Sequence, residues 1–127
     1  LARASRYARE RSVFGRPIGK NQAIQHPLAQ NWMELEAAYA MVMKGAWLYD
    51  NGKPCAPEAN AAKFLGGRAA HSACENAILT HGGLGYAKEY HVERLYREVL
   101  LTRIAPVTEQ MILNFVGEKV LGMAKSY

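Results

Sequence analysis

Apolar residues recur along much of the chain at the spacing of a helix. In the clearest stretch they are separated by alternating steps of four and three residues: Leu28, Trp32, Leu35, Tyr39, Val42, Ala46 and Tyr49. This stripe predicts a long helix that packs nearly parallel to its neighbours. Pro27 is acceptable in the first turn of a helix but disruptive deeper in one, so we expect the helix to start near His26 or to kink there.

Glycine and proline divide the chain into five helical segments. The breaks are FGRPIGK at 14–20, DNGKP at 50–54, HGGLGY at 81–86 and RIAPV at 103–107. The third segment, 56–80, has Pro57 and Glu58 in its first turn and is rich in alanine. The fourth covers about 90–100 and the fifth about 107–124. No segment alternates as a strand does. The sequence therefore predicts an all-α, up-and-down helical bundle, with two long helices and shorter ones packed on them.

The length and composition fit one domain. Half of the 127 residues are apolar, which is enough for a single core. Because the chain starts at Leu1 and its first residues already have a helical pattern, we expect 1–127 to be a single helical bundle domain, a fragment of a longer subunit. No apolar run reaches roughly 18 residues, so no membrane span is expected. Cys55 and Cys74 form no paired motif and suit a reducing, cytoplasmic location.

The net charge of +5 comes largely from the start of the chain. The basic residues there, against Glu10 alone, are Arg3, Arg6, Arg9, Arg11, Arg16 and Lys20. Such a stretch can face nucleic acid, a membrane surface or a phosphorylated ligand. No regularly spaced aromatic residues accompany it, so nucleic acid is not expected as a partner. The four histidines are scattered without metal-ligand spacing, and no metal site is expected.

Two motifs in a fixed order carry more information than any single residue. The first is RSVFGRPI at 11–18, followed by Asn21 and Gln22. The second is GGLGY at 82–86, followed by EY and VERLYR at 89–97. On its own, GGLGY is typical of a helix C-terminal cap and a turn. Taken together and in this order, the motifs make the whole chain resemble the C-terminal helical domain of the acyl-CoA dehydrogenases.

The resemblance implies a function for the longer protein. Members of that family oxidise acyl-CoA thioesters to 2,3-enoyl-CoA with FAD, by removal of an α-proton and transfer of a hydride to the flavin. Most are homotetramers in which the flavin lies between subunits. The partners it implies are an acyl-CoA substrate, electron-transfer flavoprotein as acceptor, and further copies of the same subunit. The chain alone is expected to be inactive and to form at least a dimer.

The resemblance also implies which residues contact FAD. Arg11 matches the arginine that contacts the FAD pyrophosphate of a neighbouring subunit, a role that suits a planar, always charged guanidinium. Val13 stands where a hydroxyl or amide side chain is frequent, so only its backbone would serve. Phe14 would form an apolar wall near the cofactor, although a core role is equally consistent. Asn21 and Gln22 match the polar pair that reaches the adenosine portion, although a helix cap explains this pair as well.

Two later segments complete the cofactor set. The segment from Leu79 through Gly82 and Gly83 matches backbone that lies along the partner's FAD, where glycine allows close approach. Leu79 replaces a frequent glutamine, so no side-chain amide is available there. Thr108 and Gln110 match the Thr-x-Gln that touches the flavin end, at a helix start with free N–H groups.

The resemblance assigns no catalytic residue to this chain. In many family members the base is a glutamate two residues before the threonine, but Pro106 fills that position and cannot take a proton. In other branches the glutamate lies on the preceding helix, upstream of Leu1. Glu109 follows the threonine and is expected to point elsewhere. Pro106 itself fits the first turn of the last helix.

Two other functions stay open from the residues. An alanine-rich bundle with exposed apolar surface also fits a non-enzymatic helical interaction module. A related flavin oxidase on the same fold is the second alternative.

Overall fold

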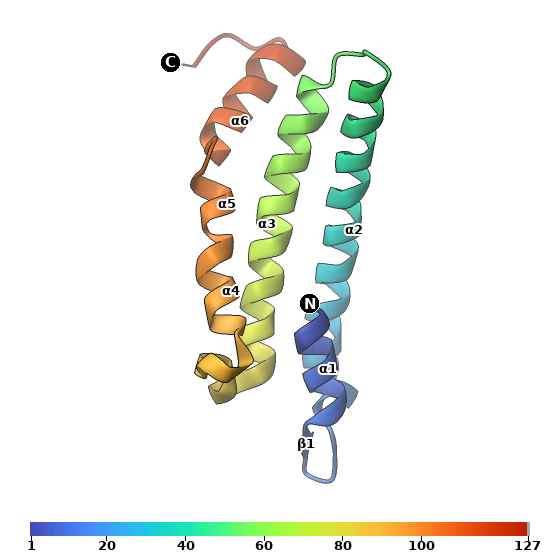
Figure 1. Cartoon of the computed structure of the whole chain (residues 1–127), viewed down its shortest axis with the longest axis vertical. Coiled ribbons are helices and arrows are strands. Elements are labelled where there is room, and N and C mark those ends of the chain that lie inside the picture. The colour runs from blue at the N-terminus through green and yellow to red at the C-terminus, as the bar shows by residue number, and fades with distance from the viewer. Residues whose placement is uncertain (127) are drawn as a thin grey trace.

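Two long helices form the body of the molecule. The computed structural model describes residues 1–126 and is predominantly helical. Helix α2, Gln22–Asp50, runs along the molecule, the chain turns at Asn51 and Gly52, and α3, Ala56–His81, runs back beside it (Figure 1). The remaining helices line other sides of α3 (Figure 1). This arrangement confirms the all-α, up-and-down bundle.

A small hairpin that the sequence did not predict follows the first helix. Helix α1, Ala2–Glu10, leads into β1, Ser12–Val13, and β2, Arg16–Pro17, which pair antiparallel with Val13 opposite Arg16. Phe14 and Gly15 have positive φ values of 52° and 77°, so they form the two-residue turn that joins such strands. The expectation of no strand was wrong here, because two residues a strand are too few to show alternation. A short 3₁₀ helix, η1 (Ile18–Lys20), then leads to α2.

The C-terminal part is more broken than the sequence predicts. After α3 come two 3₁₀ helices, η2 (Gly82–Tyr86) and η3 (Lys88–Tyr90), and then α4 (Val92–Val99) and α5 (Leu101–Ile104). Helix α6 covers Glu109–Phe115 and continues as a π-helical turn, η4, Val116–Val120. The last helix therefore starts two residues later than expected, because Thr108 is its N-cap. Pro106 precedes this helix, after a cis peptide bond, so its assignment to the first turn was wrong.

The start of α2 also differs from the expectation. The helix begins at Gln22, because the N–H groups of Ile24 and Gln25 donate to the carbonyl of Asn21. Pro27 therefore lies in the second turn, inside the helix, where it removes one backbone hydrogen bond. The hydrogen bonds of the first turn form ahead of Pro27, so the helix can begin before the proline.

Small side chains, not large ones, fill the interface between α2 and α3. The buried positions of α2 are Leu28, Asn31, Ala38 and Gly45, and those of α3 include Ala69, Ala73 and Ala77. They recur mostly seven residues apart on α2, so the predicted period is right but its face is wrong. Of the predicted stripe, Trp32, Tyr39, Val42 and Tyr49 are exposed. The two helices approach closely through their small residues, which leaves the large apolar ones of α2 uncovered within this chain.

A polar network crosses the same interface. Asn31, only 1% exposed, donates from Nδ2 to Ser72 Oγ over 2.8 Å. Its Oδ1 accepts from Asn76 Nδ2, also over 2.8 Å. A buried amide that is satisfied only in one alignment of two helices favours that alignment over a shifted one. These bonds therefore fix the register of α2 on α3.

The glycines at and after the end of α3 have different structural roles. Gly82 has a φ of 59°, which favours glycine at a helix C-terminus, as the pattern predicted. At Gly85 an added Cβ would lie 2.6 Å from the Ile78 carbonyl oxygen, so only glycine lets η2 fold against α3. At Gly83 an added Cβ would meet nothing within 4 Å, and φ is not positive there. The fold therefore requires glycine at positions 82 and 85 but not at 83.

We predict that Gly85→Ala destabilises the protein by about 1–3 kcal/mol, since backbone must move to admit the methyl group. The matched variant Gly83→Ala should leave the melting temperature nearly unchanged. Thermal unfolding followed by circular dichroism compares the two. Equal melting temperatures for both variants would show that η2 does not pack on α3 as described.

Candidate functional site

Five of the ten residues predicted to bind the cofactor line one groove. Arg11, Val13, Leu79, Gly82 and Gly83 surround an open cavity of about 350 Å³ between the end of α1, the hairpin and the end of α3. We call this cavity the Arg11 groove. The side chains of Tyr7 and His81 and those of Ile18, Thr80 and Leu84 complete its lining. Two segments far apart in sequence, 7–18 and 79–84, thus meet at this groove.

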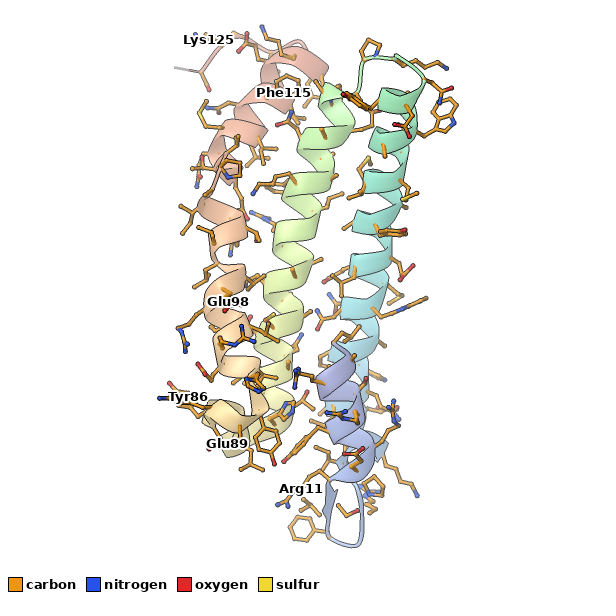
Figure 2. All side chains as sticks on the ribbon, in the orientation of Figure 1. Arg11, Tyr86, Glu89, Glu98, Phe115 and Lys125 are labelled. Atoms are coloured by element: carbon orange, nitrogen blue, oxygen red, sulfur yellow. The ribbon has the colours of Figure 1, made fainter. Side chains whose placement is uncertain are left out.

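The position of Arg11 is fixed by its backbone. It is the C-cap residue of α1, and its N–H donates to the Tyr7 carbonyl over 2.8 Å. Its own carbonyl accepts from the Ile18 N–H at 2.8 Å, which ties the helix end to the residue that follows the second strand of the hairpin. The side chain is exposed at the end of the molecule (Figure 2) and has no ion-pair partner within residues 1–126. The guanidinium is therefore available to an anion.

The glycine side of the groove carries no side chain where the fold would accept one. Residues 82 and 83 are both exposed, and Gly83 has open space where a Cβ would stand. The fold does not require glycine at position 83. The missing side chain there instead leaves room for a ligand to approach the backbone. An arginine facing bare backbone is a suitable arrangement for a phosphate-bearing ligand.

Three other predicted residues lie outside the lining of this groove. Phe14 is at the tip of the hairpin and fully exposed, at 100%. Asn21 donates from Nδ2 to the Ile18 carbonyl over 3.0 Å and accepts from Arg16 Nη2 over 2.8 Å. It occupies the N-cap position of α2, but its side chain does not cap the helix. Gln22 is exposed as the first residue of that helix. The contact with Arg16 was missed from the sequence.

The last two predicted residues lie in a separate corner. Thr108 and Gln110 line a cavity of about 290 Å³ together with Leu100, Arg103, Ile104 and Glu109. Thr108 also accepts the Met111 N–H over 3.4 Å, so its hydroxyl caps α6. The corner is attached to α3 at Arg68, which precedes Gly82 by 14 residues, or about 21 Å along a helix. Figure 1 shows the same separation, with α1 and α6 towards opposite ends of the molecule.

Comparison with known proteins identifies the family. The family described as "Acyl-CoA dehydrogenase, C-terminal domain" matches residues 1–121. The chain belongs to this family.

Individual relatives agree with the family match. The chain is 42% identical over 129 residues to the acyl-CoA dehydrogenase FadE12 of Mycobacterium tuberculosis, covering 100% of this chain and 33% of that protein. It is 47% identical over 115 residues to a probable acyl-CoA dehydrogenase, YngJ, of Bacillus subtilis, covering 91% and 30%. Its fold matches butyryl-CoA dehydrogenase from Megasphaera elsdenii with a TM-score of 0.91 at 35% identity, covering 94% and 31%. The chain thus spans about a third of the length of these relatives.

The resemblance described above leads us to expect the base of many family members at a position that is not acidic in this chain. That position is Pro106, which has no proton-accepting group. The nearest carboxylate, Glu109, is 8% exposed and engaged by two arginines. Its Oε1 accepts from Arg103 Nε over 2.6 Å, and its Oε2 from Arg103 Nη2 over 3.1 Å and Arg68 Nη2 over 3.4 Å.

This pairing makes Glu109 an anchor for the corner. The Arg103 hydrogen bonds, aided by the charges of Arg103 and Arg68, hold the pKa of Glu109 below its ordinary value. A carboxylate stabilised as its anion is a weak base, in agreement with the expectation that it points elsewhere. The two ion pairs, Arg68–Glu109 and Arg103–Glu109, join α3, α5 and α6, so they fix Thr108 and Gln110 on the rest of the domain. Only a weak sequence signal marks this role, namely a first-turn glutamate six residues after an arginine.

Sequence reasoning also missed an aromatic cluster beside the Arg11 groove. Tyr7 and His81 stack with ring centroids 4.2 Å apart, and Tyr90 meets both rings edge-on. His81 is buried, with 5% of its surface exposed. Within residues 1–126, no group of three or more potential metal ligands is present. Among the helices of the same residues, none has the length and apolar character needed to cross a membrane.

We predict a pH signature for the Glu109 anchor. Because its folded pKa is lowered, the ion pair contributes stability above the unfolded pKa of about 4.3 and loses it as the pH falls below that value. Glu109→Gln should therefore lower the melting temperature by several degrees near neutral pH, and the difference from wild type should shrink in acid. The measurement is thermal unfolding of both proteins across this pH range.

The matched control is Glu98→Gln, which removes the exposed pair between Glu98 and Arg94. An exposed pair of this kind contributes little, so its melting temperature should stay close to that of wild type at every pH. If Glu109→Gln behaved as Glu98→Gln does, Glu109 would not anchor the corner.

Proposed function

We propose that the chain is the C-terminal FAD-binding and oligomerisation domain of an acyl-CoA dehydrogenase. The full-length subunit would oxidise an acyl-CoA to the 2,3-enoyl-CoA. One observation carries the proposal. An arginine that has no ion-pair partner within residues 1–126 lines a groove together with a glycine surface, and both belong to motifs associated with FAD. The non-enzymatic interaction module has no explanation for a glycine at position 83 that the fold does not need.

Each predicted residue has a role in this proposal. Arg11 binds the FAD diphosphate with its guanidinium, while Gly82 and Gly83 let the cofactor approach the backbone. The backbone of Val13 and the side chain of Leu79 border the same groove. Asn21 and Gln22 serve the adenosine portion from the start of α2. Phe14, exposed at the hairpin tip, gains its apolar contacts from a neighbouring subunit.

Thr108 and Gln110 contact the flavin end of a second FAD molecule. Their corner meets α3 about 21 Å from Gly82 along the helix, and no lining residue is shared between the corner and the Arg11 groove. One domain therefore contributes to two cofactor sites, its own and its neighbour's. When bound, FAD supplies the acceptor for the hydride that leaves the substrate.

The α-proton is removed by a residue outside this chain. Pro106 has no basic group, and Glu109 is held as an anion by two arginines. The domain instead contributes cofactor binding, through the two corners, and subunit contacts. The exposed aromatic residues of α2, with Trp32 and Trp47 among them, suit burial against other subunits. In this proposal the substrate is an acyl-CoA, the electron acceptor is electron-transfer flavoprotein, and the full-length protein is a homotetramer. The unpaired cysteines of the chain suit a cytoplasmic location.

We predict that Arg11→Ala in the full-length subunit weakens FAD binding by about tenfold to a hundredfold. This range corresponds to a lost hydrogen bond from a charged group, about 1.5–3 kcal/mol. Titration of the flavin-free protein with FAD measures the dissociation constant. Arg9→Ala is the matched control, because it removes the same charge from α1 at a position that does not line the groove. Equal losses in both variants would reduce the effect to net charge and contradict the proposed contact.

We predict that the 127-residue chain by itself sediments as a dimer or larger, because the apolar side chains of α2 are uncovered. Analytical ultracentrifugation over a range of concentrations is the measurement. A monomer at the highest concentration would contradict an oligomerisation role for this domain.

The acceptor distinguishes the dehydrogenase from a related oxidase. A dehydrogenase reduced by acyl-CoA should be reoxidised by electron-transfer flavoprotein and slowly by oxygen. An assay for hydrogen peroxide in the presence of acyl-CoA separates these cases, since rapid stoichiometric peroxide would favour the oxidase.

A further inference from the structure

The Tyr7–His81 stack lies where the two walls of the Arg11 groove meet. The ring centroids are 4.2 Å apart with an interplanar angle of 25°. Tyr90 braces both rings, at 5.8 Å and 90° to Tyr7 and at 5.4 Å and 68° to His81. Tyr7 comes from α1 and His81 from the last position of α3, so the stack joins the ends of these two helices. Offset and edge-on arrangements of this kind are the favourable ones for aromatic rings.

Each ring is also linked to the groove wall on its own side. On the α1 side, the Tyr7 carbonyl accepts the Arg11 N–H over 2.8 Å, one helical turn away. On the α3 side, His81 immediately precedes Gly82. His81 Nδ1 lies 2.7 Å from the Ala77 carbonyl oxygen, so this nitrogen carries the proton and donates it, which fixes the ring on the helix. A movement of one ring against the other is therefore a movement of Arg11 against the glycines.

The remaining packing between the two walls is mainly aliphatic. The buried residues of α1 are Ala4 and Ala8, which pack in a cluster with Leu28, Ala77 and Val92, and the partly buried Leu1, Ile18, Ile24, Ile78 and Tyr90 pack against it. Alanine methyl groups bring α1 close to α3 but do not by themselves prevent small sliding or rotation of its end. The stacked rings restrict both movements. Contacts between Arg11 and a bound diphosphate are sensitive to such small movements, since a misplacement of about 1 Å weakens them strongly.

We propose that Tyr7 and His81 are positioning residues that set the distance between Arg11 and the glycine surface and thereby the affinity for the FAD diphosphate. This inference rests on the proposed function, because it assumes that the groove binds FAD. It assigns the two rings a role that acts through Arg11.

The experiment uses the full-length subunit, stripped of flavin and titrated with FAD. Tyr7→Leu should weaken binding by roughly threefold to tenfold, the value of an aromatic pair. Tyr7→Phe keeps the ring and should bind as wild type does. His81→Gln removes the other ring of the stack and should cause the same loss of FAD affinity. This variant replaces Tyr7→Leu in the test if Tyr7→Leu does not fold. Melting temperatures identify the folded variants.

The matched control is a tyrosine–histidine pair at a distant position of α3. His71 and Tyr96 join α3 to α4 with ring centroids 5.1 Å apart, and neither lines the Arg11 groove. Tyr96→Leu should therefore lower stability in the same manner while leaving the FAD dissociation constant unchanged. An equal loss of affinity in this control would overturn the proposal, because any weakened packing would then be sufficient.

A double-mutant cycle with Arg11→Ala decides the mechanism. If the rings act by positioning Arg11, Tyr7→Leu should cost almost nothing once Arg11 is alanine. A full, additive loss in that background would overturn the proposal, and so would unchanged affinity in both single ring variants. Should the wild-type subunit bind no FAD, the proposed function fails first and the inference with it. Wild-type binding with unaffected ring variants would instead overturn the inference alone.

Discussion

Close packing around α3 is the constraint on which the rest of this domain depends. Its buried positions are mostly glycine and alanine, so α1, α2, α4, α5, α6 and η2 all contact it. Large side chains there would push these elements outward and separate the segments that line the Arg11 groove. The Asn31–Ser72–Asn76 bonds fix the register of the longest contact, and Gly85 fixes the return of the chain at the end of the helix.

From this arrangement, the separation of the two functional corners follows. The Arg11 groove lies at the C-terminal end of α3, whereas Thr108 and Gln110 are attached near Arg68, well before that end. Under the proposed function, each corner would serve a different cofactor, one of them bound mainly by a neighbouring subunit. The oligomer in that proposal would also cover the exposed apolar face of α2 and Phe14 at the hairpin tip.

The sequence predicted the two long helices and the breaks around them well, because glycine and proline act locally. Gly82 could be assigned as a cap position for the same reason. Prediction from the sequence failed where the structure depends on contacts between residues far apart in the chain. Trp32 and Tyr39 have the period of a buried stripe, but the neighbouring line of small residues packs closer to α3. The stack of Tyr7 on His81 and the pairing of Arg68 with Glu109 join positions more than 40 residues apart, and no local pattern marks them. The individual cofactor contacts are still predictions.

The most direct test of the account is the flavin content of the full-length subunit. The protein should purify yellow, or take up FAD when it is supplied, and release FAD stoichiometrically when it is denatured. Absorbance of the folded protein and chromatography of the released cofactor measure both quantities. A folded subunit that shows no flavin absorbance and binds no added FAD would contradict the assignment of the Arg11 groove and of the Thr108 corner together.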